Sequence, residues 1–129
     1  MLNDAQSEYW FYIAQHDIDD ALILIEHHGH ADIIIYHLHQ AVEKYLKGRI
    51  LQAGVEFPYT HDLERLFLVL IEIVPKYAEI KKSIIKLHSY NKWLRYPKSD
   101  ELKNHDLMRA KEDFDIIMKE LREEPNEKL

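Results

Sequence analysis

The chain has 129 residues, of which 47% are apolar, and its 17 basic and 23 acidic residues give a formal net charge of −6. This length fits one ordinary domain with a substantial core. The negative balance argues against a protein that coats nucleic acid over its whole surface, although a local basic patch is compatible with it. The absence of cysteine excludes disulfides and thiolate chemistry. Because no apolar run approaches the roughly 18 residues of a membrane span, we expect a cytoplasmic protein with no membrane association.

Apolar residues at helical spacing predict two long helices in the first half of the chain. The first is expected from about residue 4 to residue 28, where Gly29 suits a helix end, and the second from about 31 to 53. So short a link predicts an antiparallel hairpin. Asp17 falls within the apolar stripe of the first helix. A carboxylate there needs a partner, so we expect either an ion pair with a neighbouring helix or a place in a polar pocket. The expected buried stripe of this helix is Trp10, Ile13, Ala14, Ile18, Ala21, Leu22 and Ile25.

The second helix has an apolar stripe for the core and a polar line beside it. The spacing predicts that one face packs and that the other is free to form a site. Histidines are frequent from His27 to His39, but their spacing does not suit a metal ion, so we predict no metal site and no cofactor. The stripe is Ile34, Leu38, Ala41, Val42, Tyr45 and Leu46, and the polar line is His37, Gln40, Lys44 and Lys47.

The second half of the chain predicts three further helices. One begins at Thr60 as its N-cap and closes before Pro75, and the next runs from about 76 to 94. A last helix begins between residues 100 and 104, and a charged tail at 123–129 is expected to fray. We therefore predict an all-α antiparallel up-and-down bundle of four main helices plus a C-terminal fifth, forming a single domain over 1–122. The helix over 76–94 ends in a second polar line, His88, Asn91 and Arg95.

Four segments together resemble the HEPN family of small helical bundles, named for nucleotide binding in higher eukaryotes and prokaryotes. QAVEKYLKGRIL at 40–51 is followed after a short loop by THDLERL at 60–66. YWFYIAQHDIDDALIL at 9–24 and the triplet Arg95-Tyr96-Pro97 agree with the same family. The resemblance implies a helical bundle. It leaves the function open, because the family contains nucleases, inactive relatives and partner-binding modules.

The nuclease members of that family share an arginine followed after four to six residues by a histidine. The arginine is suited to hold a phosphate, and the histidine to act as acid or base on an RNA 2′-hydroxyl. The spacing is absent here, since Arg95 is separated from the next histidine, His105, by nine residues. A metal-independent endoribonuclease toxin that uses Arg95 and His105 across the intervening loop remains an alternative.

The leading hypothesis is a nucleotide- or RNA-phosphate-binding module without robust catalysis of its own. We expect the two polar lines to meet in one groove, with Lys44, Lys47 and Arg95 on phosphates and an aromatic ring on a base. The resemblance implies a homodimer and a minimal nucleotidyltransferase as partner, in a toxin–antitoxin system; no DNA is specifically indicated. A dimerising scaffold for protein contacts is a further alternative. The expected site is Gln40, Lys44, Lys47, His88, Asn91, Arg95 and Tyr96.

Overall fold

The computed structural model describes residues 2–95 and 98–124, and within these ranges it contains helices and no strand. The predicted all-α class and helical bundle are therefore confirmed. None of the described helices is long and apolar enough to cross a membrane. The elements are α1 (Leu2–Glu26), α2 (Ala31–Gln52), α3 (Leu63–Ile73), the 3-10 helix η1 (Pro75–Ile80), α4 (Lys81–His88), α5 (Asn91–Leu94), the 3-10 helix η2 (Ser99–Glu101) and α6 (Asn104–Leu121).

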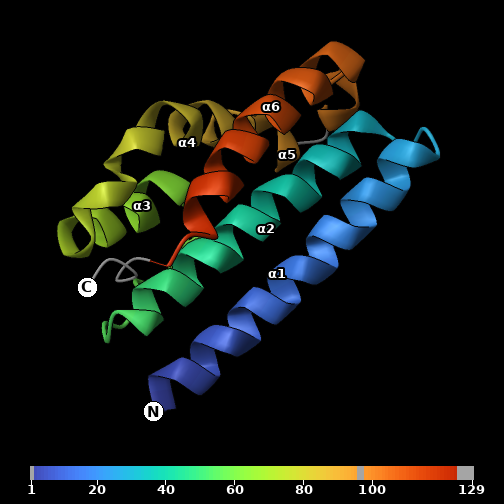
Figure 1. Cartoon of the computed structure of the whole chain (residues 1–129). Coiled ribbons are helices and arrows are strands. Elements are labelled where there is room, and N and C mark those ends of the chain that lie inside the picture. The colour runs from blue at the N-terminus through green and yellow to red at the C-terminus, as the bar shows by residue number, and fades with distance from the viewer. Residues whose placement is uncertain (1, 96–97, 125–129) are drawn as a thin grey trace.

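Helix α2 is the central rod of the bundle. Figure 1 shows α1 alongside it, with α6 on its other side and with α3 and α4 beyond. The predicted hairpin of α1 and α2 is present. In its link, the residue with a positive φ is His28, at 60°, rather than Gly29, the residue type that most often adopts this conformation just past a helix end. Gly29 instead permits a close approach, since a Cβ there would lie 3.0 Å from Leu24 Cβ.

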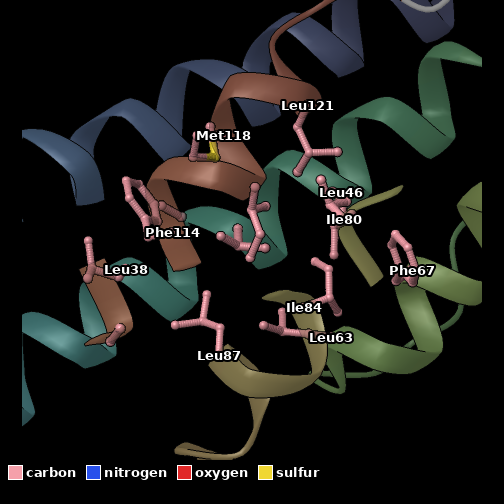
Figure 2. Packing of buried hydrophobic residues seen from close by; sticks show 14 of the residues in the cluster. Leu38, Leu46, Leu63, Phe67, Ile80, Ile84, Leu87, Phe114, Met118 and Leu121 are labelled. Carbon is pink, nitrogen blue, oxygen red and sulfur yellow. The ribbon is translucent and has the colours of Figure 1, made fainter. Parts of the chain in front are cut away.

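The core lies between α2 and the helices α3, α4 and α6. Figure 2 shows apolar side chains from all four converging on one cluster. The 3.6-residue period explains this arrangement, because it places each apolar stripe on one face. Most of the predicted stripe of α2 is buried, namely Ile34, Leu38, Ala41, Val42 and Leu46.

Two predicted boundaries need correction. The single helix expected over 76–94 is divided into η1, α4 and α5, with a break at Ser89 and Tyr90. Ser89 Oγ donates to the carbonyl of Lys86 there, an example of a side chain competing for helical backbone. Helix α3 is capped by Asp62 rather than by Thr60, because the Asp62 carboxylate accepts from the backbone N–H groups of residues 64 and 65.

Candidate functional site

A pocket of about 410 Å³ opens between α2 and α5, beside the segment that leads into α3. We call it the α2–α5 pocket. It brings together Gln40, Asn91 and Arg95, three residues that the polar lines had placed in a common site. The division of the expected fourth helix makes this possible, since α5 is a separate short element against α2. The pocket is lined by Tyr36, His39, Gln40, His61, Asn91, Leu94 and Arg95.

Arg95 and Asn91 form one polar wall of the pocket. They lie four residues apart on α5 and its end, and Arg95 Nε donates to Asn91 Oδ1 at 3.0 Å. This bond orients the guanidinium and leaves its terminal amino groups for a ligand. The described residues that line the pocket include this guanidinium and no carboxylate. The wall therefore suits an anion, and the planar guanidinium matches a phosphate.

His39 forms the buried wall. It is 2% exposed, and its Nε2 lies 3.4 Å from His88 Nδ1. His88 Nε2 lies in turn 3.3 Å from the Asp62 carboxylate that caps α3. Burial first, then the neighbouring His88, lowers the pKa of His39 from 6.5 to about 4. His39 is thus an uncharged imidazole at neutral pH, and it lies beside His88, which does not itself line the pocket.

His61 is the exposed imidazole of the pocket. Its Nδ1 lies 2.9 Å from Glu43 Oε2, while its side chain is 58% exposed. Glu43 is 3% exposed, and the same oxygen accepts from Lys47 Nζ at 2.9 Å. The other oxygen, Glu43 Oε1, has no partner among the described residues. A buried carboxylate thus holds one nitrogen of His61 and leaves the ring orientation fixed, an arrangement suited to proton transfer.

Lys44 and Lys47 do not line the pocket. Lys44 bonds to Asp17 on α1, where the second carboxylate oxygen lies 2.8 Å from His37 Nδ1. This confirms the ion-pair interpretation of Asp17. Lys47 is 8% exposed and bonds to the buried Glu43. Both ammonium groups are therefore compensated within the fold.

The remaining predicted residues are also distributed differently from expectation. His88 lies behind His39 instead of lining the pocket. His105 is 68% exposed at the start of α6, 3.6 Å from the carboxylate of its neighbour Asp106, and it does not line the pocket with Arg95. Tyr96 lies outside the described residues.

Sequence reasoning missed two aromatic walls of the pocket. Tyr36 precedes Gln40 by one helical turn on the same line of α2, and this spacing is the signal that places its ring at the pocket. The spacing of His39 and its neighbouring histidines indicates only that they do not suit a metal ion. A better signal was its position one turn before the buried Val42 and Glu43, which places the imidazole on the inner face of α2.

The family model described as the HEPN domain matches residues 7–124. Neither the curated proteins nor the solved structures gave a match to this chain.

Proposed function

The chain belongs to the HEPN family, a family of nucleotide- and RNA-related modules, and from this premise we propose that its α2–α5 pocket binds the phosphate of a nucleotide or of RNA. The observation that supports this proposal is the arrangement of one guanidinium, the amides of Gln40 and Asn91 and an uncharged imidazole around one opening. Its volume of about 410 Å³ lies in the range of small-molecule sites.

Each wall has a separate task in this proposal. Arg95 makes the charge-assisted contacts to phosphate oxygens. Gln40 and Asn91 offer amide donors and acceptors to the polar edge of a sugar or base. Tyr36, which is 45% exposed, offers a ring face on which a base stacks. We further propose that the module works beside a nucleotidyltransferase-type partner and performs no robust catalysis of its own.

Binding of ATP, GTP and a short RNA, measured by calorimetric titration at moderate salt, tests the proposal. Arg95→Ala should weaken binding at least about tenfold, since a charge-assisted contact is worth about 1.5–3 kcal/mol. Lys82→Ala is the matched control, because Lys82 is an exposed cation on α4 away from the pocket. Equal affinity of all three proteins for all three ligands would contradict the assignment of Arg95.

A second candidate function, a metal-independent endoribonuclease, is favoured by the position of His61. Its imidazole lines the same pocket as Arg95 and is held by Glu43, whereas His105 lies elsewhere. Cleavage of RNA in excess chelator should then disappear in His61→Ala and persist in His105→Ala. The reverse pattern would restore the Arg95–His105 pair, and no cleavage by the unmodified protein would eliminate this function.

Self-association is the third part of the proposal. The outer face of α1 exposes Tyr9 and Tyr12, each 61% exposed, and Ile23, 55% exposed. Tyrosine is enriched in the cores of protein interfaces, so this face suits a homodimer. Sedimentation of Tyr12→Glu against the unmodified protein tests it, since the variant should shift toward monomer. A monomeric unmodified protein at high concentration would contradict the dimer.

A further inference from the structure

A second groove lies between α1 and α6, and it shares no lining residue with the α2–α5 pocket. Its volume is about 420 Å³. The residues that form it recur at helical spacing on both rods, so each helix contributes one continuous edge. The lining includes Ile18 and Leu22 from α1, and Phe114, Met118, Lys119 and Arg122 from α6 and its end.

The floor of this groove is apolar, and its cations lie on the α6 edge, whereas on the α1 edge Gln15 donates to the carboxylate of Asp19 at 2.9 Å. Phe114 and Met118 are almost buried, whereas Leu22 is 49% exposed at the edge. Leu22 falls in the stripe of α1 for which the sequence predicts burial. It remains uncovered because α6 does not close over α1 at this level. The fold therefore leaves part of an apolar stripe without a partner.

The charge of the rim opposes that of the chain. Lys111 is neutralised by Asp115, whose two carboxylate oxygens accept from its Nζ at 2.9 and 3.0 Å. Together with Lys119 and Arg122, the lining contains three cations and one carboxylate. Its formal charge is therefore +2, against −6 for the whole chain. A positive, partly apolar surface on an acidic protein selects partners of opposite charge.

We propose that the α1–α6 groove docks an acidic amphipathic helix of a partner protein. The two walls are themselves helices, so the groove follows their axes and fits a third rod laid along it. An apolar side chain of the partner covers Leu22 and the floor, and its flanking carboxylates pair with Lys119 and Arg122. This surface is separate from the α2–α5 pocket and goes beyond the phosphate-binding function.

A synthetic amphipathic peptide, with leucines at helical spacing flanked by glutamates, is the probe. Titration at low salt should show saturable binding that Lys119→Glu/Arg122→Glu weakens about tenfold or more. The control Lys81→Glu/Lys82→Glu reverses two exposed cations of α4, giving the same change in net charge away from the groove. It should bind the peptide within about twofold of the unmodified protein.

Charge exchange makes the test sharper. The Lys119→Glu/Arg122→Glu protein should bind a peptide in which lysines replace the glutamates, and the unmodified protein should not. Methyl resonances of Leu22 and Met118 should shift on binding of the acidic peptide, which locates it in the groove. Equal losses in the two double variants would overturn the proposal. A short RNA that displaces the peptide, or a self-dimer that is lost in the groove variant alone, would overturn it in favour of those occupants.

Discussion

His39 Nε2 and His88 Nδ1 lie 3.4 Å apart, and the imidazole of His39 is 2% exposed at the wall of the α2–α5 pocket. Other ionisable groups act on His39 from several elements: Glu43 from α2, Asp62 from the cap of α3 and Arg95 from the end of α5. Burial and His88 have the largest effects and favour the uncharged ring. The pocket thus contains an imidazole that stays neutral between about pH 6.5 and pH 4, a range in which an ordinary histidine takes up a proton.

Acidification should destabilise the protein through this residue. The pKa of His39 falls from 6.5 to about 4 on folding, so between these values the unfolded chain binds a proton that the folded chain does not. Stability is therefore full above about pH 6.5 and decreases as the pH falls toward about 4, by on the order of 3 kcal/mol. Urea unfolding across this range measures the loss.

Two variants isolate the contribution of His39. His39→Gln should flatten the dependence of unfolding free energy on pH between 6.5 and 4. His27→Gln, which alters an exposed histidine after α1, should leave it unchanged. An unaltered slope in His39→Gln would mean that this buried ring does not cause the acid sensitivity.

Lys44 should matter to stability rather than to ligand binding. Its ammonium and His37 share the carboxylate of Asp17, whose side chain is 11% exposed. Asp17→Ala removes the shared acceptor and should cost about 1–3 kcal/mol in unfolding free energy. Lys44→Ala should leave nucleotide affinity within about twofold, because the proposed ligand contacts lie in the α2–α5 pocket, which Lys44 does not line. A tenfold loss of affinity in Lys44→Ala would return this residue to the site.

Lys47 should behave as a buried structural cation. Its Nζ lies 5.4 Å from the Trp10 ring centroid and 5.2 Å from that of Phe57, and it bonds to Glu43. Lys47→Met keeps the packing but removes a charge partner from a buried carboxylate, so we expect a loss of about 3–5 kcal/mol. Glu43→Gln in the same chain should recover part of it, because the uncompensated charge is gone. Additive losses in the double variant would contradict this coupling.

Gly48 is required by the close packing of α1 on α2. A Cβ at this position would lie 2.4 Å from Phe11 Cε1, and the Phe11 ring is stacked 4.5 Å from that of Tyr45. Gly48→Ala should therefore lower the unfolding free energy by about 1–3 kcal/mol. Phe11→Leu added to Gly48→Ala should lose less than the sum of the two single changes. A neutral or stabilising Gly48→Ala would show that the Phe11 ring moves aside at little cost.

The fold was predictable from the sequence because its determinants are local. The stripe of Ile34, Leu38 and Leu46 follows the helical period, and all three are buried as that period requires. Gly29 and Pro75 mark the ends of helices correctly to within a few residues. The break between α4 and α5 was not visible, because Ser89 and Tyr90 carry no strong breaker signal in the sequence.

The site was only partly predictable because its determinants are not local. Gln40 and Lys44 are one turn apart on one predicted line, yet Gln40 lines the pocket while Lys44 turns to Asp17, 27 positions away along the chain. Lys47 likewise donates to Glu43, and its ammonium lies over the rings of Trp10 and Phe57. Spacing gives the face of a helix, but the partner of each charge depends on which helix packs against that face.

Ligand binding within the α2–α5 pocket is reported most directly by the side-chain amides of Gln40 and Asn91, which line it. In a nuclear magnetic resonance titration with ATP or a short RNA, both amide signals should shift and saturate together. The same titration of Arg95→Ala should need at least about tenfold more ligand. If the amides of Gln15 and Gln52 shift while those of Gln40 and Asn91 stay fixed, the ligand binds elsewhere and the central claim is contradicted.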